Sequence, residues 1–382
     1  MDTFIKNYQN FVRSLYKTEE FIPLHAPTFN GNEKRYLSNC IDSTFVSSVG
    51  EYVSRFEDMM ASYTGCKHAV AVSNGTSALH LALKVSGVDN GDEVITQALS
   101  FIATANAISY TGAKPVFVDV EQDTLGLSPD CLENWLRKNA IVKGDSCINI
   151  HTHRRIKACV PMHTFGHPCK IEAIAKICEE YNIELIEDAA ESLGSFYRKK
   201  HLGTFSRVGI ISFNGNKVIT TGGGGVLLFN DESLAKQAKH LSTQAKIPHK
   251  WEFSHDHIGY NYRMPNINAA LGCAQLENID QILESKREIA HQYCNFFENT
   301  IVKFVKEPID SKSNYWLNSI LFENKEQRDY FLRLSNEQGI MARPIWNLLN
   351  SLDMYNDCQT DDLIVSKCLS ERLVNIPSSP KY

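Results

Sequence analysis

The chain has 382 residues, of which 43% are apolar, and its formal net charge at pH 7 is −5. This length accommodates two domains with sizeable cores. The acidic balance and the pI of about 6.2 exclude the basic stripe typical of nucleic-acid-binding proteins, and no apolar run is long enough to span a bilayer. The eleven cysteines follow no spaced framework, so we expect reduced thiols in a cytoplasmic protein that does not act at a membrane.

Short β-rich runs alternate with amphipathic helical stretches from residue 68 to about residue 245. The expected strands are His68–Val72, Glu93–Thr96, Lys114–Val120, Arg155–Pro161, Glu184–Glu187, Gly209–Phe213 and Gly225–Phe229. The helices expected between them include Thr76–Val85, Ile102–Tyr110, Pro129–Lys138 and Ile171–Tyr181. Strands that are apolar on both faces and alternate with helices predict an α/β fold, in which helices cover both faces of a mainly parallel sheet.

The pattern changes after about residue 250. Apolar residues at helical spacing predict one long helical segment from Ile267 to about Phe297. A strand over Asn314–Phe322 and a helix over Lys325–Glu337 follow. We therefore expect a large domain over residues 1–250 and a smaller C-terminal α+β domain over residues 251–382.

Histidines and cysteines gather between residues 151 and 169 at a spacing that could supply zinc ligands. The group comprises His151, His153, Cys159, His163, His167 and Cys169. Cys159, however, lies in an apolar run that is expected to be a strand, where successive side chains face opposite sides. The pattern therefore favours ordinary core and loop residues over a metal site.

Ligands of parallel sheets bind beyond the carboxyl ends of the strands, so functional residues are expected just after each strand. The turn Ser73–Ser77 leads from a strand into a helix and could bind a phosphate through backbone N–H groups. A plain helix cap by Ser73 or Asn74 would give the same pattern. Phe101 follows the second strand, where its ring could stack on a flat heterocycle or lie in the core.

Two later strands are followed by ionisable side chains that are stronger candidates for a catalytic role. Asp188 and Glu191 follow one strand, where a carboxylate could pair with a protonated ring nitrogen or simply be solvated. Lys217 follows the next strand in a loop of small residues and could form a Schiff base, although most lysines are solvated surface residues. The glycines at 222–225 come after Lys217 and so do not form a P-loop.

In this order, five motifs of the chain resemble those of the DegT family of sugar-nucleotide aminotransferases, which have the fold of aspartate aminotransferase. The resemblance runs from about Ile22 to the C-terminus. The motifs are Ser73–Leu79, Phe101–Thr104, Glu187–Glu191, Ser212–Lys217 and Gly259–Met264. The resemblance implies pyridoxal 5′-phosphate as the cofactor and amino-group transfer as the reaction.

The resemblance also implies roles for individual residues. Lys217 would hold the cofactor covalently and move a proton, Asp188 would pair with the pyridine nitrogen, and Phe101 would stack on the ring. Glu191 stands where many relatives carry Gln or His near the ring hydroxyl. The phosphate would be bound by Gly75, Thr76, Ser77 and Ser212. Asn261 would reach the phosphate in the neighbouring subunit, which implies a homodimer with shared active sites.

The segments Ile22–His25 and Asp42–Val53 resemble the subgroup that aminates C4 of a UDP-linked 4-keto-6-deoxy-N-acetylhexosamine in legionaminic acid or bacillosamine pathways, with L-glutamate as donor. Three alternatives stay open: a GDP-linked 4-keto-6-deoxyhexose as substrate, a cofactor-binding regulator, or an unrelated nucleotide-dependent oxidoreductase. The presence of Lys217 and Asp188 argues against a regulator. The first strand is not followed by G-x-G-x-x-G, which argues against the oxidoreductase.

Overall fold

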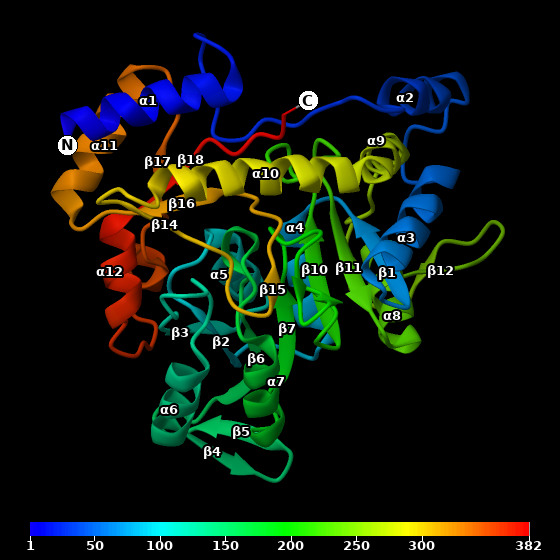
Figure 1. Ribbon diagram of the computed structural model, residues 1–382. Coiled ribbons are helices and arrows are strands. Elements are labelled where there is room, and N and C mark those ends of the chain that lie inside the picture. The colour runs from blue at the N-terminus through cyan, green and yellow to red at the C-terminus, as the bar shows by residue number, and fades with distance from the viewer. Residues whose placement is uncertain (382) are drawn as a thin grey trace.

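The computed structural model describes residues 1–381, and a nine-stranded sheet lies at its centre (Figure 1). Its strands are β1 (His68–Val72), β2 (Glu93–Gln97), β3 (Lys114–Val118), β4 (Ala140–Lys143), β5 (Ser146–Asn149), β6 (Arg155–Val160), β7 (Glu184–Asp188), β10 (Val208–Ser212) and β11 (Gly225–Phe229). The main order is β1-β11-β10-β7-β6-β2-β3, and the hairpin of β4 and β5 is attached to β6. Strands from β10 to β3 pair in parallel, and only β11 runs against its neighbours in the main order. The expected mainly parallel α/β fold is confirmed.

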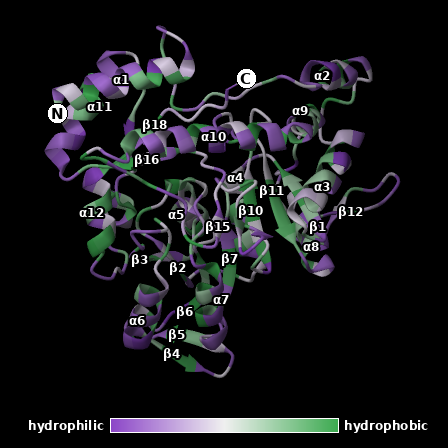
Figure 2. Ribbon diagram, viewed as in Figure 1, coloured by the Kyte–Doolittle hydropathy of each residue, from purple (hydrophilic) through white to green (hydrophobic). Residues whose placement is uncertain are grey.

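Helices cover this sheet on both faces. They are α2 (Glu33–Asp42), α3 (Glu51–Thr64), α4 (Gly75–Val85), α5 (Ile102–Tyr110), α6 (Pro129–Asn139), α7 (Ile171–Glu180), α8 (Glu232–Ser242) and α9 (Asn266–Glu277). The neighbouring residues Ile210 and Ile211 of β10 belong to two different hydrophobic cores, one under α4 and α8 and the other under α3 and α9. Because successive side chains of a strand face opposite sides, a strand between two cores must be apolar throughout. Figure 2 shows this as largely green central strands.

The C-terminal part forms a second layer beside the large sheet. Its elements are α10 (Ile279–Phe297), β14 (Lys303–Phe304), β16 (Asn318–Leu321), α11 (Lys325–Glu337), β17 (Arg343–Pro344), α12 (Ile364–Arg372) and β18 (Leu373–Ile376). The four strands form an antiparallel sheet in the order β14-β16-β18-β17. Short strands elsewhere are β8 (Phe196–Tyr197), β9 (Lys200–His201), β12 (Lys246–Ile247), β13 (Ser254–His255) and β15 (Ser311–Lys312). The combination of helices and an antiparallel sheet is the expected α+β arrangement.

Two expected elements differ from those observed. The long helical segment after Ile267 is two helices, since the chain leaves the helical conformation at Asn278, between α9 and α10. The expected strand Asn314–Phe322 is shortened to β16 because the Asn314 side chain accepts a bond from the Trp316 backbone N–H and donates to the carbonyls of Glu191 and Leu193. Local bonds of this kind compete with strand pairing.

Helix α1 (Asp2–Tyr16) packs with the C-terminal layer although it begins the chain (Figure 1). Tyr8 is fully buried and its ring lies 4.9 Å from that of Phe331 in α11. The division at about residue 250 stays a prediction, but the packing joins α1 to residues that lie beyond it in the sequence. Across residues 1–381, no helix combines the length and the apolarity needed to cross a membrane.

Candidate active site

A cavity of about 870 Å³ lies at the carboxyl edge of the parallel strands. Most residues predicted from the sequence to bind the cofactor line it together: Gly75, Thr76, Phe101, Asp188, Glu191, Ser212 and Lys217. They come from the ends of β1, β2, β7 and β10 and from the loop after β10, because parallel strands bring their carboxyl ends to one edge. The opposite wall comes from the C-terminal layer and from the segment Pro23–His25.

The start of α4 forms the end of the cavity that could bind an anion. Asn74 caps this helix by accepting a bond from the Ser77 N–H at 2.8 Å. The first N–H groups of a helix have no partner within the helix, and here Gly75 and Thr76 line the cavity beside Ser212. A Cβ atom at Gly75 would lie 2.9 Å from Ser212 Cβ, so no side chain fits between the helix and β10. This arrangement suits a phosphate group.

Asp188 ends β7 as a buried carboxylate that faces the cavity. The Thr104 hydroxyl donates to its Oδ2 at 2.7 Å and the Ala190 N–H donates to its Oδ1 at 3.2 Å. Burial raises the pKa of Asp188, and these bonds together with the charge of Lys217 oppose the rise. Since both of its hydrogen-bond donors are neutral, Asp188 is a fitting partner for a cationic N–H group in the cavity.

Lys217 lies between a carboxyl group and an aromatic face. Its Nζ atom is 3.1 Å from Glu191 Oε1 and 3.8 Å from the centre of the Trp316 ring. Glu191 also accepts a bond from the Phe165 N–H at 2.9 Å through its other oxygen. Burial raises the pKa of Glu191 to about 7, although the nearby Lys217 lowers it. The amine is thus held beside the cavity by a group that titrates near neutral pH.

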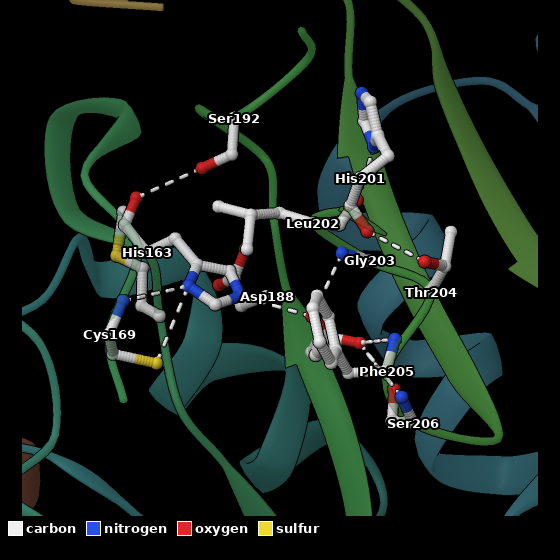
Figure 3. Close-up of polar contacts among 12 residues, drawn as sticks. His163, Cys169, Asp188, Ser192, His201, Leu202, Gly203, Thr204, Phe205 and Ser206 are labelled. Carbon is white, nitrogen blue, oxygen red and sulfur yellow. Dashed lines mark hydrogen bonds and ion pairs between the residues drawn. The ribbon is translucent and has the colours of Figure 1, made fainter. Parts of the chain in front are cut away.

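A second buried network surrounds Glu187, the residue before Asp188 in β7 (Figure 3). Glu187 is fully buried and accepts bonds from the N–H groups of Gly203, Phe205 and Ser206 and from His163 Nε2 at 3.2 Å. The Cys169 N–H donates to His163 Nδ1 at 3.2 Å, which leaves Nε2 as the nitrogen that donates to Glu187. Burial alone would raise the pKa of Glu187, but these donors bring it below its usual value. The network holds the segment Gly203–Ser206 against the end of β7.

Other predicted residues lie outside the cavity. Ser77 is buried as the third residue of α4, and its hydroxyl lies 3.2 Å from that of Ser73. Asn261 is exposed in a segment that bridges to Thr243, and it does not line the cavity of its own chain.

The histidine and cysteine group at 151–169 does not assemble into a cluster of three or more ligands within residues 1–381. Only His163 and Cys169 come together, with 3.4 Å between Nδ1 and Sγ. The interpretation of this group as core and loop residues stays a prediction.

Several cavity residues had no signal in the sequence. Trp316 donates its ring N–H to the Asn216 carbonyl at 2.6 Å and covers Lys217, yet it lies far from Lys217 in the sequence. Trp346 lies 6.1 Å from the Phe101 ring, and Arg343 and Asn347 line the same wall. Neither motif nor periodicity marks these residues, because the packing of the C-terminal layer alone brings them here.

The cavity residues fit pyridoxal 5′-phosphate. A helix start with Ser212 beside it suits the phosphate, the Lys217 amine suits an aldehyde, and buried Asp188 suits a protonated ring nitrogen. Phe101 lines the cavity and is 48% exposed, so its ring is accessible for stacking on a flat group. The fold and the chemistry of this cavity are those of a pyridoxal-phosphate-dependent aminotransferase.

The chain belongs to the DegT/DnrJ/EryC1/StrS aminotransferase family, which matches residues 27–382. It is 39% identical to the GDP-perosamine synthase of Escherichia coli O157:H7 and 36% identical to that of Vibrio cholerae, each alignment covering 94% of both chains. The structure of the aminotransferase TlmJ from Streptoalloteichus hindustanus is similar with a TM-score of 0.85 and 27% identity, over 94% of this chain and 93% of that one. The protein is a sugar aminotransferase that depends on pyridoxal phosphate.

Proposed function

We propose that the protein transfers an amino group from L-glutamate to C4 of a GDP-linked 4-keto-6-deoxyhexose. The observation that carries this choice of nucleotide is the similarity, over 94% of both chains, to two enzymes named GDP-perosamine synthase. The UDP-linked N-acetylhexosamine, favoured by the segments Ile22–His25 and Asp42–Val53, is less well supported. The GDP-linked sugar, which was the alternative, therefore becomes the main hypothesis.

The cavity geometry supports distinct roles for its residues. Pyridoxal phosphate, when bound, supplies a ring that accepts the electrons of the broken C–H bond. Lys217 binds the cofactor and afterwards carries the proton between the two carbons that exchange it. Asp188 keeps a proton on the ring nitrogen, Phe101 packs on the ring face, and Glu191 receives the free Lys217 amine at the observed 3.1 Å. Gly75, Thr76 and Ser212 bind the phosphate.

A homodimer completes this site in our proposal. Asn261 is exposed and does not line the cavity of its own chain, and in the homodimer it would reach the phosphate in the second subunit. Exposed apolar side chains lie at the end of α2 and in the connection that leads into α3, at Ile41, Phe45 and Val49. A second copy of the chain would remove this apolar surface from water.

The absorption spectrum of the purified protein with pyridoxal phosphate tests the proposal. We expect a visible band from the lysine-bound cofactor that disappears with L-glutamate and returns with a GDP-linked 4-keto-6-deoxyhexose. Lys217→Ala should lack the band, and the exposed Lys199→Ala should keep it. Recovery with the UDP-linked N-acetylhexosamine alone would reverse the choice of nucleotide, and a wild type without the band would refute the role of Lys217.

A further inference from the structure

His25 lies on a wall of the cavity that the chemistry above does not use. It belongs to the extended segment between α1 and α2, which runs beside the C-terminal segment in Figure 1. Hydrogen bonds hold the backbone on both sides of His25: the Ser378 N–H donates to the Leu24 carbonyl at 2.7 Å, and the Ala26 N–H donates to Ser379 Oγ at 2.8 Å. The imidazole is therefore carried into the cavity wall by a backbone that is fixed in place.

The His25 ring has no protein partner for its polar atoms. Both ring nitrogens are buried, and neither has a hydrogen-bond partner within residues 1–381. Burial lowers the pKa of His25, and the charges of Lys286 and Lys217 lower it further, so the ring is neutral. A neutral imidazole offers one N–H donor and one acceptor. Rotation of the ring by 180° exchanges each nitrogen with a carbon while the ring occupies the same space. The ring can therefore present a nitrogen to the cavity.

A second histidine, His167, also has a ring without hydrogen-bond partners among residues 1–381 but does not line the cavity. His167 is also buried with both ring nitrogens unpartnered within the described residues, but it packs edge-on against Tyr315 at 5.3 Å and does not line the cavity. An unsatisfied imidazole is therefore no sign of a ligand by itself. His25 differs because its ring borders space that a substrate must enter.

We propose that His25 binds a hydroxyl group of the substrate's sugar ring and helps to select the sugar, an inference that rests on the proposed function. The reacting carbon of the sugar must approach Lys217, and His25 lines the same cavity as Lys217. A hydroxyl group both donates and accepts, so it matches a neutral imidazole. The carboxylates of glutamate only accept and match it less well.

Calorimetric titration of the cofactor-loaded protein tests this role, with GDP-mannose and GDP as probes. GDP-mannose carries sugar hydroxyls but no ketone, so it binds without turnover. We expect His25→Leu to weaken the binding of GDP-mannose about tenfold, since one hydrogen bond to the sugar is lost. The affinity for GDP should be unchanged. His25→Gln, which retains a donor and an acceptor, should recover part of the affinity. His167→Leu is the matched control and should bind both probes as the wild type does.

The other outcomes discriminate between explanations. Equal GDP-mannose affinity for wild type and a folded His25→Leu variant would overturn the inference, as would an equal loss for GDP and GDP-mannose. A slower loss of the visible band with L-glutamate, at unchanged GDP-mannose affinity, would place His25 at the amino donor instead and also overturn it. If the wild type binds UDP-N-acetylglucosamine rather than GDP-mannose, the proposed nucleotide is wrong and the same variants are compared on UDP-N-acetylglucosamine and UDP. A wild type that binds neither sugar overturns both proposals.

Discussion

Asp188 and Glu191 are two buried acids three positions apart, and their neighbours give them different chemistry. Asp188 accepts bonds from the Thr104 hydroxyl and a backbone N–H, whereas Glu191 accepts one from a backbone N–H and lies 3.1 Å from Lys217 Nζ. Burial raises the pKa of both, and that of Glu191 reaches about 7. The motif Glu187–Glu191 predicted where these acids lie, but not which of them would titrate near neutral pH.

We expect Glu191 to make stability depend on pH. Its pKa is about 7 in the folded, cofactor-free protein and near 4.5 when unfolded, so the unfolded chain loses the proton first as pH rises. The free energy of unfolding of wild type relative to Glu191→Gln should therefore fall by up to about 3 kcal/mol between pH 4.5 and 7, and then level off. Urea unfolding at several pH values measures this difference. A constant difference across that range would contradict it.

At the scale of elements, the start of α4 lies against the strands of the large sheet without room for side chains. Gly225 begins β11, and a Cβ atom there would lie 2.5 Å from the Asn74 carbonyl oxygen and 2.9 Å from the Gly75 nitrogen. Alternation of apolar runs predicted both the strand and the helix. It did not predict this contact, because the pairing of β1 with β11 that creates it joins segments far apart in the chain.

Gly225→Ala should displace the start of α4. The added methyl group meets backbone atoms that cannot give way, so we expect a loss of about 2 kcal/mol in the free energy of unfolding and weaker binding of pyridoxal phosphate. Urea unfolding and titration with the cofactor measure the two effects. Gly223→Ala is the matched control, since its nearest atom, the Ser73 carbonyl oxygen, would lie 3.7 Å away. Equal behaviour of the two variants would refute the role of this contact.

At the scale of the whole molecule, the two ends of the chain form one layer. Tyr8 of α1 packs among Phe296, Phe297 and Phe331 of α10 and α11. The Tyr8 hydroxyl has no hydrogen-bond partner within residues 1–381, so the ring alone accounts for the contact. The segment that follows α1 then carries His25 to the cavity. The N-terminal residues thus belong to the layer that forms the far wall of the site.

Tyr8 substitutions test this union of the two ends. Tyr8→Ala removes a fully buried ring and should lower the free energy of unfolding by about 4 kcal/mol. Tyr8→Phe removes only the unpartnered hydroxyl and should change it by less than about 1 kcal/mol. Both values come from urea unfolding of the full chain. A small effect of Tyr8→Ala would mean that α1 adds little to the C-terminal layer.

The sequence by itself determined the mainly parallel sheet and most of the residues at its carboxyl edge that line the cavity. Periodicity marks buried strands, and the carboxyl ends of parallel strands meet at one edge, so Gly75, Asp188, Ser212 and Lys217 could be brought together without coordinates. Only the tertiary structure decided the opposite wall. Trp316 covers Lys217 and His25 lines the same cavity through packing between segments far apart in the chain, and such packing leaves no periodic or local signal in the sequence.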